Sequence, residues 1–232
     1  MRVISVVLLC VLAVAAAPLD SFAQELLPSE VLKEFVADQS RLWQAPLKVK
    51  RKDAKWLGPL AAGTLALLAT DRSISQGLRI EDLRRPSRYL AKAGAAGPLL
   101  TVSTGLLLSG KIAGDSTALN AGQRSLKALI HTELVVRGLK VITNRERPNK
   151  ANGLGQFWGG GRSFPSAHAA DTWAFATVIA HEYKDKRLIG IAAYSLASLV
   201  TVSRISGQHH FPSDTLIGAS IGRLIGKYIV RK

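Results

Sequence analysis

The feature that most constrains the fold is a series of six apolar blocks that fill the chain after residue 55. They are rich in Ala, Leu and Gly, are of helix length, and lie at 56–70, 94–113, 126–142, 169–183, 188–202 and 215–230. None alternates apolar and polar residues with the period of two that a half-buried strand requires. The blocks therefore predict an all-α fold, a helical bundle of about six core helices.

The length of the blocks bears on whether this bundle lies in a membrane. A spanning helix needs about 20 apolar residues, whereas most blocks reach only about 15 before a charge, and mean hydropathy is only +0.16. However, the blocks are nearly uncharged, unlike amphipathic surface helices. Gly218, Gly222 and Gly226 share the four-residue spacing that permits close helix contact. We expect a membrane-embedded bundle, with a soluble periplasmic bundle as the alternative.

The first 23 residues have the layout of a secretory signal. Arg2 supplies a positive charge, 3–17 is an almost unbroken apolar run, and 21–23 resembles a cleavage site, with a cut after Ala17 as a second option. Because the run is short for a spanning helix, we expect cleavage rather than a retained anchor. Removal of 1–23 takes away Cys10, the single cysteine. A mature chain then has no disulfide, thiolate metal site or cysteine nucleophile.

The remainder divides into two parts by composition. Residues 24–55 form a polar segment in which loosely spaced apolar residues predict an amphipathic helix, and 56–232 form the expected catalytic domain. The chain carries 31 Lys and Arg against 16 Asp and Glu, which suits an anionic partner. The basic run at 48–52 has no interleaved aromatic residues, so we expect a juxtamembrane face there and no nucleic-acid partner.

A first polar segment follows the third apolar block, with Lys140 and then Arg147-Pro148 seven residues later. Pro148 is expected to end the preceding helix. Lys140 and Arg147 would then clamp one phosphate, Arg as a bidentate fork and Lys as a point charge, with Arg145 assisting. Taken alone, the segment equally fits a basic helix end that offsets the macrodipole.

A second segment, Pro165-Ser166-Ala167-His168, precedes the fourth block. Ser166 is a favoured N-cap residue. The free N–H groups of Ala167 and His168 would face an anion, and His168 could protonate a leaving group. Taken alone, the segment is an ordinary helix start with a surface histidine.

A third segment runs from Ser203-Arg204 to His210 and Asp214, just before and inside the last block. Pro212 suits the first position of that helix. A carboxylate at Asp214 can hold one imidazole nitrogen of His210 as N–H and leave the other free to attack. His209 has no carboxylate at the same offset, so it is taken as a neighbour.

In order and spacing these segments resemble the signature of the type 2 phosphatidic acid phosphatase and vanadium haloperoxidase superfamily, over residues 56–232. The resemblance implies two-step phosphoryl transfer without cofactor or metal. His210 would form a phosphohistidine, Asp214 would orient it, and His168 would protonate the leaving alcohol and then activate water. The implied phosphate-binding groups are Lys140, Arg147, Ser166, Ala167 and Arg204. The family usually has glycine where this chain has Ala167, whose methyl group crowds the phosphate.

The expected function is a metal-independent phosphatase of phosphate monoesters or pyrophosphates, chiefly of lipids such as phosphatidate, phosphatidylglycerol phosphate, undecaprenyl pyrophosphate or lipid A phosphate. It would lie in a bacterial inner membrane with its site facing the periplasm; a soluble periplasmic acid phosphatase is the alternative. The glycine-rich stretch 149–162 lacks the Gly-Lys-Ser/Thr of a P-loop. It is interpreted as a flexible loop in which Phe157 and Trp158 either touch lipid or anchor the loop.

Three other functions compete with this one. A vanadate-dependent haloperoxidase would use the same pocket. A metallohydrolase would use His168, His210 and Asp214 as ligands, but carboxylates are sparse around the motifs and cations abundant, which disfavours a divalent metal. A basic membrane-binding or nucleic-acid-binding bundle without enzymatic activity would leave the three motifs unexplained.

Overall fold

The structure is a computed structural model that describes residues 29–78, 84–150 and 153–232. The predicted signal peptide, 1–23, lies outside these residues. The chain divides into two compact units, Met1–Val49 and Lys50–Lys232. In its described part the first unit contains helix α3 (Ser29–Gln44) and the short 3₁₀ helix η1 (Ala45–Lys48). A helix therefore forms within the polar segment, as its spacing predicts.

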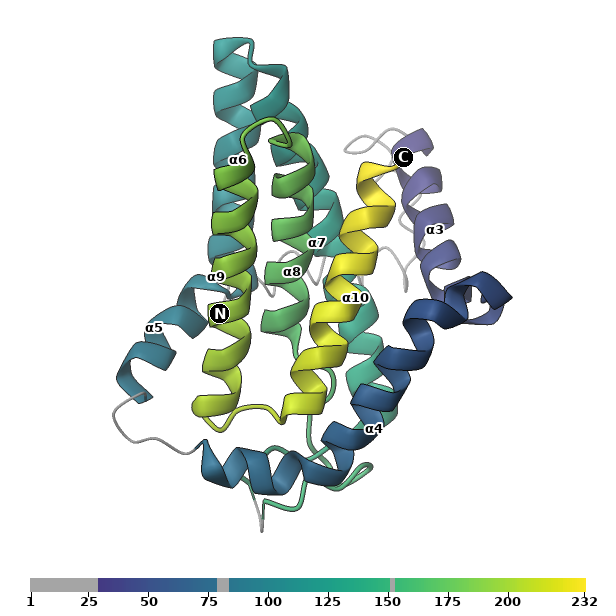
Figure 1. The fold of residues 1–232 in the computed structure, drawn as a ribbon. Coiled ribbons are helices and arrows are strands. Elements are labelled where there is room, and N and C mark those ends of the chain that lie inside the picture. The colour runs from purple at the N-terminus through teal and green to yellow at the C-terminus, as the bar shows by residue number, and fades with distance from the viewer. Residues whose placement is uncertain (1–28, 79–83, 151–152) are drawn as a thin grey trace. The chain divides into compact units, whose positions relative to one another are not determined.

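The second unit is helical throughout its described elements, and Figure 1 shows their order. These are η2 (Arg51–Asp53), α4 (Ala54–Gly77), α5 (Arg84–Ala93), α6 (Ala96–Ala113), α7 (Ser116–Thr143), α8 (Ala167–Glu182), α9 (Arg187–Ser206) and α10 (Pro212–Val230). Each of the six apolar blocks lies within one of these helices or extends at most two residues beyond it, which confirms the all-α class and the six core helices. Helix α5 was not predicted, because its sequence is short and basic and does not form an apolar block.

Local capping fixes where α7 begins and ends. The Asp115 side chain accepts hydrogen bonds from the backbone N–H of Thr117 at 2.8 Å and of Ala118 at 3.2 Å, so the helix starts ten residues before the apolar block. Its C-cap, Asn144, has a φ of 44°, the left-handed conformation that ends many helices. The expectation that Pro148 ends this helix is therefore wrong, since α7 already stops at Thr143.

Helix α8 occupies the centre of the second unit and packs against α7, α9 and α10 (Figure 1). Its contact with α10 is close because α10 presents glycines. A Cβ atom on Gly218 would lie 2.4 Å from the Ser166 carbonyl oxygen, and one on Gly222 only 1.9 Å from that of Ala170. The four-residue glycine spacing thus lets two backbones meet, and this contact places the start of α8 beside the start of α10.

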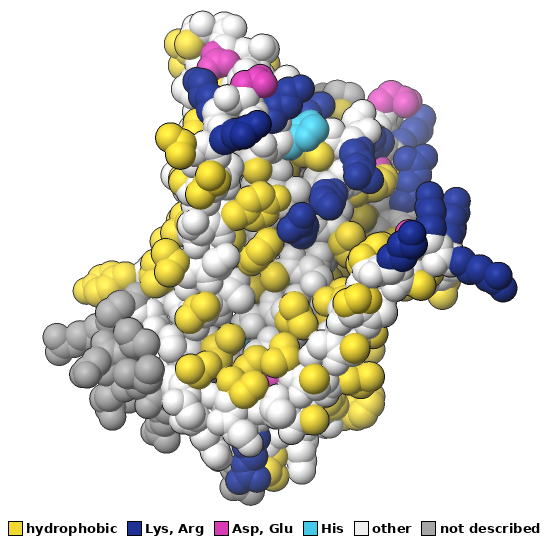
Figure 2. All heavy atoms as spheres, viewed as in Figure 1, with side chains coloured by type: hydrophobic (Ala, Val, Ile, Leu, Met, Phe, Trp, Pro, Cys, Tyr) yellow, Lys and Arg dark blue, Asp and Glu magenta, His cyan; other side chains and the backbone are white. Residues whose placement is uncertain are grey.

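Two of the described helices, α6 and α9, are long and apolar enough to cross a membrane, with mean hydropathies of 1.2 and 1.6. Both direct apolar side chains outward, among them Val102 and Ile112 on α6 and Leu188, Ile191 and Leu199 on α9. Figure 2 shows hydrophobic side chains spread over the front of α9 and α10, with most Lys and Arg in the upper part of the view. Exposure of so much apolar surface to water is unfavourable, which favours a lipid environment.

Candidate active site

All the site residues predicted from the sequence lie at one end of the helical unit. The last turn of α7 and the loop after it, the first turn of α8, the last turn of α9 and the first turn of α10 meet there. The residues brought to this end are Lys140, Arg147, Ser166, Ala167, His168, Arg204, His210 and Asp214. Their charges are near enough to influence one another across the four helices.

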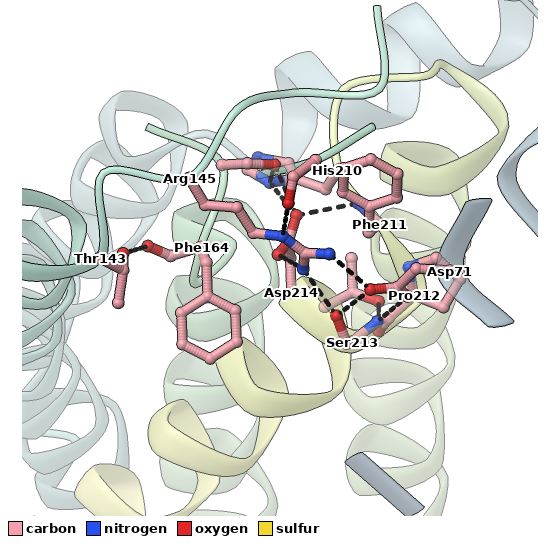
Figure 3. A network of polar contacts seen from close by, with 12 residues as sticks. Asp71, Thr143, Arg145, Phe164, His210, Phe211, Pro212, Ser213 and Asp214 are labelled. Carbon is pink, nitrogen blue, oxygen red and sulfur yellow. Dashed lines mark hydrogen bonds and ion pairs between the residues drawn. The ribbon is translucent and has the colours of Figure 1, made fainter. Parts of the chain in front are cut away.

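His210 and Asp214 form a buried pair at the start of α10. The His210 Nδ1 atom lies 3.6 Å from Asp214 Oδ2, and the two side chains are 2% and 0% exposed. Asp214 Oδ2 also accepts hydrogen bonds from the Phe211 backbone N–H at 2.9 Å and the Ser163 hydroxyl at 2.5 Å. Figure 3 shows His210 above this carboxylate. With Nδ1 facing the carboxylate, Nε2 is the ring nitrogen left to meet a substrate.

The environment keeps the imidazole of His210 uncharged. Burial lowers the pKa of His210 from 6.5 to about 4, although the hydrogen bond and charge of Asp214 act in the opposite direction. Burial and the positive charge of Arg204 likewise lower the pKa of the neighbouring His209 to about 4. A neutral imidazole has a free lone pair, so His210 can act as a nucleophile near pH 7.

Three cations converge on the same end of the bundle. The Lys140 ammonium donates hydrogen bonds to the carbonyl oxygens of Arg162 at 2.8 Å and Ser163 at 3.3 Å. Arg204 is 6% exposed, and its Nε atom finds no hydrogen-bond partner among the described residues. Burial lowers the pKa of Arg147, against the charge of Asp214. Lys140 and Arg147 are half-buried and Arg204 is buried. Like charges that are partly withdrawn from water repel one another, so an anion among them would be stabilised.

The start of α8 supplies neutral donors. Ser166 occupies the N-cap position, yet its side chain makes no capping bond, and its buried hydroxyl has no partner among the described residues. This differs from the ordinary N-cap that the sequence also allowed. Ala167 and His168 are partly exposed, and the helix N-terminus offers free N–H groups to an anion. The hydroxyl of Ser166 and these N–H groups are therefore available to a ligand.

Arg145 has a different place from the one expected. Its guanidinium is buried and donates to Asp214 Oδ1 at 2.6 Å, to Asp71 Oδ2 at 2.8 Å and to the Gly155 carbonyl oxygen at 3.0 Å. It is therefore not a further phosphate clamp. Sequence reasoning missed this pairing, together with Asp71 and Ser163. The one available signal was an acidic residue directly after the first apolar block.

The described part of the loop before α8 is held in place. The backbone N–H of Trp158 donates to Thr143 at 2.9 Å, and that of Gly161 donates to Asn144 at 3.1 Å. Phe157 packs on Phe164, with ring centroids 5.6 Å apart, whereas Trp158 is 78% exposed. The loop is thus tied down rather than free, and its two aromatic residues divide between anchoring and exposure.

The donors at this end do not suit a divalent metal. No group of three or more His, Cys, Asp or Glu among the described residues has the arrangement of a metal site. Both Asp214 oxygens already accept hydrogen bonds from Arg145, Ser163 or the Phe211 N–H. The surrounding charges are positive, which favours an anion instead.

Comparison with known proteins gives one family match and one similar curated protein. Residues 124–232 match the model of the PAP2 superfamily. A stretch of 66 residues, 28% of the chain, is 39% identical to lipid A 1-phosphatase from Porphyromonas gingivalis, and the match covers 15% of that protein.

Two solved structures share the fold. A transmembrane PAP2 type phosphatidylglycerolphosphate phosphatase from Bacillus subtilis matches 75% of this chain and 93% of its own, with a TM-score of 0.60 at 23% identity. The match to Aquifex aeolicus LpxE covers 71% of this chain and 94% of that protein, with a TM-score of 0.55 at 27% identity. The family match contains all three motifs that meet at the site. Residues 124–232, a little under half of the chain, are therefore similar to the PAP2 superfamily.

Proposed function

We propose that this protein is a metal-independent lipid phosphatase that works through a phosphohistidine on His210. The observation that carries the proposal is the convergence of Lys140, Arg147 and Arg204 on a buried, neutral His210 paired with Asp214. Such a site neutralises phosphate charge with fixed cations and needs no metal to do so. The names of the similar proteins, a lipid A 1-phosphatase and a phosphatidylglycerolphosphate phosphatase, support a lipid substrate.

In the first step His210 Nε2 attacks phosphorus in line with the leaving alcohol. The N–P bond forms as the P–O bond breaks. Because burial and the charge of Arg204 lower the pKa of His168 to about 3, His168 takes a proton from the bound phosphate monoanion and passes it to the departing oxygen. Asp214 stabilises the positive charge that the imidazole gains. The non-bridging oxygens are bound by Lys140, Arg147, Ser166, the Ala167 amide and Arg204.

In the second step water replaces the enzyme on phosphorus. His168, now neutral, takes a proton from the water, whose oxygen bonds to phosphorus as the N–P bond breaks. Inorganic phosphate leaves, and His210 returns to its neutral form. The same histidine thus serves as acid and then as base, as reversal of proton transfer requires.

The outward apolar side chains of α6 and α9 support a membrane location, as does the fold shared with a transmembrane phosphatase. The active site then opens at one membrane surface, where a lipid phosphate can reach it. Basic residues occur at both ends of the helices, so charge bias does not set the orientation. The predicted signal at 1–23 is the reason for placing the site on the periplasmic side of the inner membrane.

Phosphate release from a panel of substrates tests this function. The full chain in detergent micelles is given phosphatidate, phosphatidylglycerol phosphate, undecaprenyl pyrophosphate, lipid A phosphate and p-nitrophenyl phosphate, all in EDTA. We expect release from at least one lipid in the wild type and a loss of at least about 10³-fold in His210→Ala. When the substrate carries ³²P in its phosphate, the label should remain on the wild-type protein after an alkaline quench and be released in acid, as phosphohistidine requires.

Several results would contradict the proposal. An active His210→Ala protein of unchanged helical circular dichroism excludes the nucleophile. Loss of activity in EDTA that one metal restores indicates a metallohydrolase. Halide oxidation with added vanadate, without phosphate release, indicates a haloperoxidase. Extraction without detergent and equal activity on p-nitrophenyl phosphate indicate a soluble acid phosphatase.

A further inference from the structure

A buried guanidinium lies between two carboxylates behind the nucleophile. Arg145 is 3% exposed and bridges Asp214 at 2.6 Å and Asp71 at 2.8 Å (Figure 3). The rings of Phe157 and Phe211 lie 4.8 and 4.4 Å from it. The guanidinium is therefore fixed on all sides, and water does not screen its charge.

Asp71 binds the backbone that carries Asp214 as well as this cation. Its Oδ1 atom accepts the Ser213 N–H at 2.9 Å, and its Oδ2 atom accepts the Ser213 hydroxyl in a short hydrogen bond. Arg145 also donates to the Ser213 hydroxyl, at 2.8 Å. Asp71 belongs to α4, which lies outside the matched segment 124–232. Helix α4 thus contributes a buried carboxylate to the catalytic end of the bundle.

The charges in this network matter to His210. Lys140 from α7, His168 from α8 and Arg204 from α9 face the imidazole, and none of them favours a positive charge on it. Asp214 from α10 is the carboxylate that does. Because Arg145 is shared with Asp71, two negative charges meet one positive charge, and a net negative charge remains beside the ring.

We infer that Arg145 and Asp71 are positioning residues for the phosphohistidine step, an inference that rests on the proposed function. Arg145 holds the Asp214 carboxylate in the orientation that His210 requires. Asp71 accepts hydrogen bonds from Arg145 and Ser213 and so fixes both. Because the positive charge of Arg145 is shared between Asp71 and Asp214, Asp214 keeps enough negative charge to stabilise the imidazolium. Neither residue touches the phosphate.

Two substitutions of opposite electrostatic sign test this role. Asp71→Asn removes a negative charge, and Arg145→Gln removes a positive one. The matched control is Glu182→Gln, which breaks the 2.6 Å ion pair with Arg124 at the far end of α8. We measure kcat and KM for dioctanoyl phosphatidate in EDTA, and the imidazole titration of His210 by NMR. The resonance is assigned by its loss in His210→Asn, since the chain has five histidines.

We expect kcat to fall roughly tenfold to hundredfold in both variants, with KM within about twofold of the wild type. The His210 titration should move to lower pH in Asp71→Asn and to higher pH in Arg145→Gln, because a nearby anion favours the charged imidazole and a cation opposes it. The control should change neither quantity. General damage to the fold does not produce shifts of opposite sign.

The inference is overturned if both variants keep wild-type kcat, if the two titrations move in the same direction, or if Glu182→Gln loses as much activity. If Asp71→Asn does not fold, Arg145→Gln alone decides. Reduced kcat with an upward titration supports the role, and wild-type kcat refutes it. A wild type inactive on every ester is failure of the proposed function instead. The NMR titrations then still test the charge network.

Discussion

Ser166 has a side chain that forms no hydrogen bond within the described part of the fold. Its hydroxyl is buried at a helix start without a partner among the described residues. A buried hydroxyl without a hydrogen bond costs stability. The same hydroxyl stabilises a bound phosphate if it donates to one of the oxygens.

Ser166→Ala should therefore separate function from stability. We expect kcat/KM for the best lipid substrate to fall about tenfold to hundredfold, while the melting temperature stays unchanged or rises slightly. Ser163→Ala is the contrasting variant, because Ser163 donates to Asp214 at 2.5 Å. That substitution should lower both quantities. A clear loss of thermal stability in Ser166→Ala would show that its hydroxyl has a structural partner after all.

The low pKa of His210, about 4, predicts how the free energy of unfolding depends on pH. Unfolded chains bind a proton on this histidine near pH 6.5, whereas the folded protein does so only near pH 4. Between these values the unfolded state binds more protons, so acidification lowers the free energy of unfolding. Below about pH 4 both states are protonated, and this group has no further effect.

Thermal unfolding of the wild type and of His210→Asn in detergent, at pH 7 and at pH 4.5, checks this pH dependence. On acidification we expect the melting temperature of the wild type to fall roughly 5 °C further than that of the variant. The contributions of the other histidines cancel in the difference, except for the effect that the charge of His210 has on His168. Equal losses would mean that His210 titrates near its ordinary pKa in the folded protein.

At the scale of the element, the contact between α8 and α10 sets the geometry of the site. The backbone of Ser166 donates to the Asp214 carbonyl oxygen at 2.9 Å, which couples the two helix starts directly. Gly218 and Gly222 let the helices approach closely enough for this bond. The two histidines proposed to be catalytic, on α8 and just before α10, therefore depend for their positions on glycines that have no side-chain chemistry.

Gly222→Ala tests that dependence. The added methyl group would lie 1.9 Å from a backbone oxygen, which cannot move without separating the helices. We expect a loss of about 2–4 kcal/mol in stability and a marked loss of kcat. Gly97→Ala in α6 is the control, because a methyl group there meets nothing within 4 Å. Unfolding temperature and phosphate release measure both effects, and equal behaviour of the two variants would refute the argument.

At the scale of the whole molecule, the sequence predicts the features that depend on residues near one another in the chain. Six apolar blocks predict six helices, because burial requires runs of apolar residues. The spacing of polar residues within three segments predicts the site. Helix α5 and the first turns of α7 escape prediction because they are polar and held by capping or tertiary contacts. The end of α7 depends on the left-handed conformation of Asn144. The sequence does not reveal this conformation, and Pro148 suggested a later end.

The pairing of Asp71 with Arg145 is beyond sequence patterns for a different reason. The two residues are 74 positions apart, and no helical period relates them. Only the packing of α4 against α10 brings the carboxylate to the site. Sequence reasoning placed Arg145 with the predicted phosphate-binding cations because Lys140 and Arg147 flank it in the chain. The structure pairs Arg145 with Asp214 and Asp71, whereas Arg147, two residues later, acts on the cations Lys140 and Arg204.

The position of Asp71 also bears on how such an enzyme can be divided. A fragment limited to 124–232 would keep all three motifs and every group proposed to touch phosphate. It would lack the carboxylate on α4 that holds Arg145 and the start of α10. In split-protein or minimal-enzyme designs based on this fold, the smallest working unit is therefore larger than the segment that carries the signature.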